Sequence, residues 1–144
     1  MKIRDILAAK GSSVVTVPPS ASVLQAMAEL VKHNIGAVVV VDDAIRGILS
    51  ERDLLRVAAA DVRRLETAIV RDVMTRNIIT ASPEAEISAV MDLMTSRRFR
   101  HLPVVDGADR LVGIITIGDV VNALRQSVEA ENRHLHAYIH GVPA

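Results

Sequence analysis

Two stretches of the chain share one pattern: GILSERD at residues 47–53 and GIITIGD at residues 113–119. Each reads glycine, two apolar residues, a hydroxyl residue, two variable positions and an aspartate. A hydroxyl residue followed three positions later by an acid is typical of a helix start, because each side chain can bind the other's backbone N–H group. An apolar stretch precedes the hydroxyl in both copies. The pattern therefore predicts, twice, a strand that runs directly into a helix.

The context of this pattern is duplicated as well. Three more pairs of segments match: IRDIL with VRDVM, VVTV with IITA, and IGAVVVVD with FRHLPVVD. Such self-similarity is the signature of a repeated structural unit. We therefore predict a first unit at 1–62, a second unit at 63–126 and a C-terminal helical tail at 127–144. Each unit is small for a core of its own, so we expect the two to share one.

The sequence pattern of each unit predicts the element order β-α-β-β-α, which places the chain in the mixed α/β (α+β) class. Apolar residues at helical spacing predict the first helix of each unit, and Ser22 with Gln25 predicts its capping box in the first unit. Continuous β-branched runs predict buried strands. The predicted elements are strands at 14–17 and 78–80, helices from Val23 and Ile87, strands at 37–41 and 102–105, strands at 47–49 and 112–115, and helices at 51–60 and from Ile117 into the tail.

Composition narrows the classes of partner. Of the 144 residues, 50% are hydrophobic and only 1% aromatic, and no cysteine is present. Scarce aromatic rings disfavour a single-stranded nucleic-acid platform, and a formal net charge of zero disfavours duplex DNA or an anionic membrane as the main partner. Without cysteine, disulfides and thiolate chemistry are excluded. The longest apolar run, 35–41, is far below the roughly 18 residues of a membrane span, and no signal-peptide pattern opens the chain, so we expect a cytoplasmic protein.

The repeated motif supports two interpretations, and spacing leaves both open. In the first, Ser50 with Asp53 and Thr116 with Asp119 are helix caps. In the second they also bind a ligand. Free N–H groups and the helix dipole favour an anion, the motif glycines would admit a ligand close to the backbone, and an aspartate can accept two hydrogen bonds from a ribose diol.

Charge placement in the first motif also supports a ligand. Arg52 lies in the first turn of its predicted helix, where the dipole disfavours a cation, and Arg56 follows four residues later with the same charge. A bound phosphate would turn both penalties into charge-assisted contacts. The alternative is surface pairing with Glu51 or another acidic neighbour.

The ordered set of motifs resembles a tandem pair of cystathionine-β-synthase (CBS) domains, a Bateman module, over about residues 1–126. The segments VMTRNIITASPEAEI, RHLPVVD and LVGIITIGDVV are especially similar to the family pattern. The resemblance implies two β-α-β-β-α repeats packed sheet to sheet. It also implies a regulatory module, and not an enzyme, that binds an adenine nucleotide such as AMP, ADP or ATP between its units. Such pairs commonly form homodimers through their helices.

The resemblance further assigns roles to positions of this chain. Asp53 and Asp119 would hold ribose hydroxyls, with Ser50 and Thr116 on ribose or phosphate. Arg52 would meet phosphate. The second motif lacks this arginine, so its phosphate would need Arg98, Arg100 or His101. The base is implied to be framed by backbone, at the first site that of Thr16, Val17, Ile35, Gly36 and Ala37, and at the second that of Ile79, Thr80, Arg100, His101 and Leu102.

Two other functions stay open: a structural dimerisation module that binds no ligand, and a pair that binds NAD. The tail places His136 and His140 one helical turn apart, but no carboxylate completes the set, so we predict no metal site. No HExxH motif, Walker loop or nucleophile with a nearby base is present, so we predict no catalytic residue and no catalytic cofactor.

Overall fold

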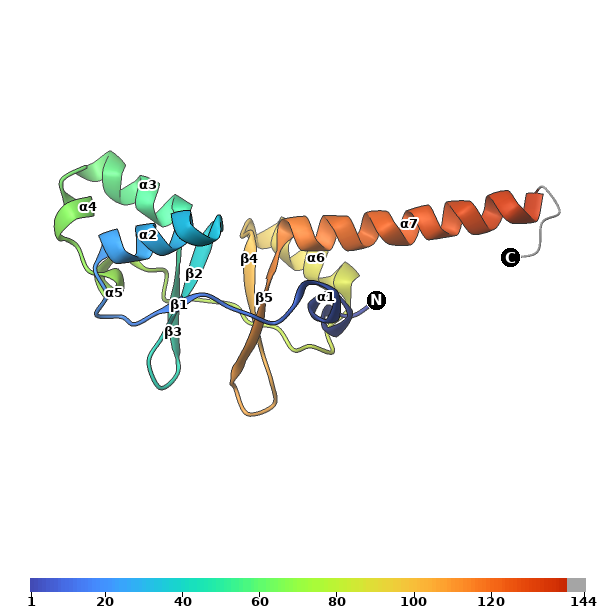
Figure 1. Ribbon diagram of the computed structural model, residues 1–144, viewed down its shortest axis with the longest axis horizontal. Helices are drawn as coiled ribbons and strands as arrows, with labels where there is room; N and C mark the ends of the chain where they lie inside the picture. Colours follow the sequence, from blue (N-terminus) through green and yellow to red (C-terminus); the bar gives the residue numbers. More distant parts are fainter. Residues whose placement is uncertain (140–144) are drawn as a thin grey trace.

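The computed structural model describes residues 1–139, with side chains up to residue 132. The predicted strand at 78–80 is absent, and two short helices open the second unit. In chain order the elements are α1 (Ile3–Lys10), β1 (Thr16–Val17), α2 (Val23–His33), β2 (Ala37–Val41), β3 (Ile45–Ser50), α3 (Glu51–Ala60), α4 (Arg64–Thr67), α5 (Val70–Val73), α6 (Ile87–Arg97), β4 (His101–Val105), β5 (Leu111–Thr116) and α7 (Ile117–Ile139) (Figure 1).

The strands form two sheets with matching geometry. β1 pairs in parallel with β2, which pairs antiparallel with β3, and β4 pairs antiparallel with β5. Ala37 lies opposite Ser50 in the first sheet, as His101 lies opposite Thr116 in the second. The register shifts late in both hairpins. The predicted mixed α/β class is therefore confirmed, and the duplication extends to the pairing register.

The missing strand at 78–80 has a physical cause. In the first sheet Val39 donates its N–H group to the Val15 carbonyl at 3.2 Å. Pro103 occupies the corresponding place in the second sheet and has no N–H group to donate. Only a single parallel bridge forms there, between Ala81 and Val104. The prediction of a strand at 78–80 is thus wrong.

The expectation of one shared core is wrong too: the described side chains form two core clusters, and each contains a helix from the other sequence unit. Ile3 and Ile6 of α1 are buried in the cluster formed by α6, β4, β5 and α7. Val70 of α5 and the following Met74 are buried in the cluster formed by α2, β2 and β3. These helices are the matched segments IRDIL and VRDVM. The two units therefore exchange their first helices.

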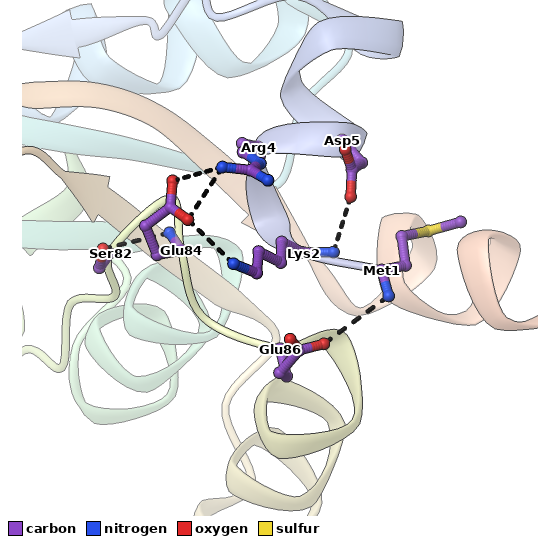
Figure 2. Close-up of polar contacts among 7 residues, drawn as sticks. All are labelled: Met1, Lys2, Arg4, Asp5, Ser82, Glu84 and Glu86. Carbon is purple, nitrogen blue, oxygen red and sulfur yellow. Dashed lines mark hydrogen bonds and ion pairs between the residues drawn. The ribbon is translucent and has the colours of Figure 1, made fainter.

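The beginning of α1 is attached to the segment before α6 (Figure 2). Ile3 donates its N–H group to the Ala85 carbonyl at 3.0 Å. Lys2 and Arg4 pair with Glu84 at 3.1 and 3.0 Å. Surface ion pairs of this kind contribute little stability, so burial of the apolar face of α1 accounts for most of the attachment.

The closing helices begin where the motif predicts. α3 follows Ser50, and α7 follows Thr116. The capping box of Ser22 with Gln25 at α2 is also confirmed. α7 is 23 residues long and extends away from β4 and β5 (Figure 1). The predicted tail is therefore helical as far as Ile139, and its residues 125–132 are all exposed.

Candidate functional site

The first motif forms a closed set of hydrogen bonds at the start of α3. Ser50 donates to Asp53 Oδ2 through its N–H group at 2.9 Å and through Oγ at 3.1 Å. The Asp53 N–H group donates back to Ser50 Oγ at 3.4 Å. Asp53 is only 5% exposed, and a buried carboxylate requires such partners. The prediction that these residues cap the helix is confirmed.

Two further residues contact the other oxygen of this carboxylate. Thr75 donates its hydroxyl to Asp53 Oδ1 at 2.9 Å, and Arg56 Nη1 lies 3.5 Å from the same oxygen. Sequence reasoning missed Thr75, although it directly follows the repeated segment VRDVM. The acidic partner of Arg56 is thus Asp53, one turn back on the same helix.

The motif glycines contact protein, and the prediction that they admit a ligand is wrong. A Cβ at Gly47 would lie 2.6 Å from the Thr75 carbonyl oxygen. A Cβ at Gly113 would lie 2.6 Å from Leu7 Cδ2. Both distances are shorter than any real Cβ contact. The two glycines instead allow the segment after α5 to lie against β3, and α1 to lie against β5.

A cavity of about 590 Å³ opens in front of the first motif. This volume lies within the range of sites for small ligands. Both sequence units line it, because the turn before β4 faces the start of α3. The lining residues are Gly36, Ile48, Ser50, Glu51, Arg52, Asp53, Leu55, Arg56, Thr75, Arg98, Phe99, Arg100 and His101. A ligand in this cavity would contact both units at once.

The predicted site residues are only partly brought together. Those that line the cavity are Gly36, Ser50, Arg52, Asp53, Arg100 and His101, whereas Thr16, Val17, Ile35, Ala37, Ile79, Thr80 and Leu102 do not line it. The side chains of Val17, Ala37 and Leu102 are buried, and the backbone role predicted for these residues stays a prediction.

Arg100 and His101 differ from their prediction. The sequence assigned them to the second site, but both residues line the cavity at the first motif. The Arg100 carbonyl still accepts a hydrogen bond from the Ile117 N–H group at 2.9 Å, so the backbone remains joined to the second motif. In the first motif the Gly36 carbonyl accepts the Glu51 N–H group in the same way, at 3.0 Å.

The cavity is rich in cationic side chains. Arg52 and Arg56 come from α3, and Arg98 and Arg100 come from the turn before β4, against the carboxylates of Glu51 and Asp53. The dipole of α3 adds partial positive charge at the N-terminus of this helix. This combination favours an anionic ligand, and guanidinium groups suit phosphate in particular.

His101 lies between the two motifs. A Cβ at Gly36 would lie 3.1 Å from His101 Nε2, so the ring packs against the start of β2. Burial lowers the pKa of His101, and Arg100 and Lys10 lower it further, while Glu51 and Asp119 act in the opposite direction. His101 is therefore neutral at pH 7, where it can donate or accept one hydrogen bond.

The second motif has a different partner on its aspartate. Asp119 Oδ2 accepts the Thr116 N–H group at 2.9 Å, and the Asp119 N–H group donates to Thr116 Oγ1 at 3.1 Å. Lys10, at the end of α1, donates Nζ to the same Asp119 oxygen at 2.7 Å and to the Ile114 carbonyl at 3.1 Å. Burial raises the pKa of Asp119, but the hydrogen bonds from Lys10 and Thr116 outweigh this and leave the pKa below its usual value.

Neither metal ligation nor membrane insertion is indicated within the described part of the chain. Over those residues no group of three or more His, Asp or Glu side chains could hold a metal ion. His134, His136 and His140 lie outside the described side chains. None of the described helices is both long enough and apolar enough to span a bilayer.

Comparison with known proteins identifies the family. The family model described as "CBS domain" matches residues 3–60 and 70–126. The "CBS domain-containing protein CBSX3, mitochondrial" of Arabidopsis thaliana is 36% identical over 149 residues, covering 96% of this chain and 72% of the relative.

Solved structures show the same fold. The CBS-domain containing protein ATU1752 from Agrobacterium tumefaciens is 41% identical with a TM-score of 0.82, covering 85% of this chain and 98% of that one. CBSX2 in complex with AMP is 31% identical with a TM-score of 0.71, covering 87% and 96%. The CBS domain pair of protein MJ0100, in complex with 5'-methylthioadenosine and S-adenosyl-L-methionine, is 29% identical with a TM-score of 0.76, covering 88% and 98%. The chain belongs to the CBS domain family and carries two copies of the domain in tandem.

Proposed function

We propose that this protein is a regulatory module that binds an adenine nucleotide of the AMP, ADP or ATP type in the cavity at the first motif. One observation carries the proposal: the capped start of α3 and four arginines from both units converge on the cavity. An adenine nucleotide combines a ribose diol with one or more phosphates, and the cavity holds groups for both. The AMP complex of CBSX2 supports this ligand class.

Each group in the cavity has a part in this proposal. Asp53 accepts the ribose hydroxyls, and Ser50 with the N–H groups of α3 faces the ribose or phosphate. Arg52 and Arg56 approach the phosphate from α3, while Arg98 approaches it from the second unit. Arg56 lies 3.5 Å from Asp53, so a phosphate would compete for its guanidinium group and free the Asp53 oxygen for ribose.

Signalling follows from the position of the cavity between the units. A ligand that contacts both units favours the arrangement of the units in which both sets of contacts form. It changes the relative populations of two such arrangements only if it binds one of them more tightly than the other. The protein has no catalytic role in this proposal and acts in the cytoplasm through a partner or through its own assembly.

The assembly that we propose is a homodimer formed through exposed apolar helix faces. Val31 on α2 is 82% exposed, and Leu55 on α3 is 69% exposed. On α7, Val121 and Val128 lie two turns apart and are also exposed. Large apolar side chains at these helix positions are typical of an association surface.

Thermal unfolding with a ligand panel tests the nucleotide proposal. The panel is AMP, ADP, ATP, NAD and S-adenosylmethionine, and at a hundredfold excess over its dissociation constant a ligand stabilises the fold by about 2.7 kcal/mol. Asp53→Ala should remove the part of the shift that arises from binding at the first motif. Asp92→Ala is the matched control, because Asp92 is an exposed carboxylate on α6 away from the cavity.

The outcome separates the candidate functions. A shift with NAD alone would support a dinucleotide ligand. The nucleotide proposal fails if no compound raises the melting temperature of the wild type and Asp53→Ala loses only the stability of a helix cap, about 0.5–2 kcal/mol. The protein is then a structural dimerisation module.

A further inference from the structure

The two motif aspartates occupy equivalent places, but different side chains approach them. In the first motif the partner from outside α3 is a neutral hydroxyl, Thr75 Oγ1, at 2.9 Å from Asp53. In the second motif the partner is an ammonium group, Lys10 Nζ, at 2.7 Å from Asp119. Arg56 of α3 also lies 3.5 Å from Asp53, so each carboxylate has a cationic neighbour, which comes from the same helix in the first motif and from α1 in the second.

The same backbone arrangement positions both partners. Gly47 lets the Thr75 backbone lie against β3, where Thr75 and Ile48 exchange two hydrogen bonds of 2.9 and 3.0 Å. Gly113 lets Leu7 of α1 lie against β5, which brings the end of α1 over the Ile114 carbonyl. The packing of α1 thus places Lys10 at the second motif, where the exposed side chain donates hydrogen bonds to both Asp119 and the Ile114 carbonyl.

The second carboxylate is also more open than the first. The Asp119 side chain is 22% exposed, whereas that of Asp53 is 6% exposed. The hydrogen bonds that the described residues make to the Asp119 carboxylate fall on Oδ2, so Oδ1 has capacity for a further donor. Gly118 stands where the first motif has Arg52, and a Cβ there would meet only Thr116 Oγ1, at 3.6 Å. The second motif therefore lacks the side chain that Arg52 provides in the first.

We propose that Lys10 is the specificity-determining residue of a second ligand site at Thr116 and Asp119, and that it selects adenosine ligands that carry a phosphate over those that do not. The inference rests on the proposed function, which it extends to the second motif. Lys10 takes the role that Arg52 has in the first motif, although it comes from a helix more than a hundred positions earlier in the chain.

The selection follows from competition for the ammonium group. Lys10 occupies the Asp119 oxygen that a ribose diol requires for full hydrogen bonding. An uncharged nucleoside offers Lys10 no other anion, so its diol must share the carboxylate with the lysine. A phosphate at the start of α7 offers the ammonium group a second anion and relieves this competition.

Calorimetric titration with AMP and adenosine tests the proposal in the Asp53→Ala protein, in which only the second site retains its aspartate. The Asp53→Ala protein should bind AMP more tightly than adenosine. Lys10→Met should weaken AMP binding about tenfold or more, the scale of one lost charge-assisted hydrogen bond, and should leave adenosine binding equal or tighter. Lys10→Arg should retain the preference for AMP. Lys32→Met is the control, because Lys32 is an exposed lysine on α2.

Three results would overturn the inference. The first is an unchanged preference for AMP in Lys10→Met. The second is an equal loss of AMP and adenosine affinity, which a merely structural lysine would give. The third is loss of all AMP binding in Asp53→Ala alone, which refutes a second site while the proposed function stands. If the wild type itself binds none of these ligands, the proposed function fails as well.

Discussion

Replacement of Gly47 by alanine should destabilise the fold far more than the same replacement at Gly113. At Gly47 the new methyl group would lie 2.6 Å from the Thr75 carbonyl oxygen, which accepts the Ile48 N–H group, and the Thr75 N–H group donates to Ile48 in return. Relief of this contact requires the backbone after α5 to move off β3. At Gly113 the close atom is Leu7 Cδ2, the end of a flexible side chain that can change rotamer.

The expected loss in the free energy of unfolding follows from the contacts that each substitution disturbs. Overpacking in a rigid region costs about 1–3 kcal/mol. At Gly47 the displaced Thr75 also weakens its hydrogen bond to the buried Asp53 carboxylate, a charged-group bond that contributes about 1.5–3 kcal/mol. We therefore expect a loss of about 3 kcal/mol for Gly47→Ala and about 1 kcal/mol for Gly113→Ala.

Urea unfolding followed by circular dichroism measures both losses. Gly107→Ala is the control, since a Cβ there meets no atom within 4 Å, and it should change the free energy of unfolding by less than about 0.5 kcal/mol. We predict the larger loss at Gly47 because the contact there is with rigid backbone, whereas the contact at Gly113 is with a flexible side chain. Equal losses for Gly47→Ala and Gly113→Ala, or a smaller loss for Gly47→Ala, would refute this explanation.

Three further changes have defined outcomes. Ser22→Ala removes the hydroxyl that accepts the Gln25 N–H group at 3.0 Å, and it should lower the free energy of urea unfolding by about 1 kcal/mol. Because the pKa of His101 is lowered in the folded protein, the unfolded state binds the proton more readily. The free energy of unfolding should therefore fall as the pH drops below 6.5, the ordinary pKa of histidine. Urea unfolding of His101→Gln should show a flatter dependence of this free energy on pH, and equal slopes for the wild type and the variant would contradict the prediction. The double variant Val31→Lys with Leu55→Lys should sediment as a monomer where the wild type sediments as a dimer, and a dimer in both would place the interface elsewhere.

Local features of the fold could be predicted from the sequence because their causes are local. The helix starts at Ser22, Ser50 and Thr116 depend on residues within one turn, and β2 and β4 depend on continuous apolar runs. The strand at 78–80 could not be predicted from its own residues. Its absence depends on Pro103 in the neighbouring strand, where the N–H group required for pairing is missing.

The site was harder to predict because it depends on how the units meet. The motif pairs of Ser50 with Asp53 and Thr116 with Asp119 are local and were identified. Their outer partners, Thr75 and Lys10, come from elements that pack against the opposite unit, and no spacing rule joins them to the motifs. The function of the glycines was misread for the same reason, since the atoms that they accommodate belong to these distant segments.

The arginine and histidine assignments show the same limit. Arg100 precedes β4, so chain order associates it with the second motif, and its backbone does contact the start of α7. The residue, however, also lines the cavity at the first motif. Backbone neighbours can be inferred from a repeat, whereas a contact across the boundary between repeats requires the three-dimensional arrangement.

The exchange of α1 and α5 means that the repeats are interlocked and cannot be treated as separable modules. A fragment ending after α3 would carry α1 without the cluster that buries Ile3 and Ile6, and would lack Val70 and Met74 from its own core. The complementary fragment would have the reverse defect. Loss of either half therefore exposes apolar surface in the other, so unfolding of the two repeats is coupled. For the same reason, a substitution in the core of one repeat bears on the stability of both.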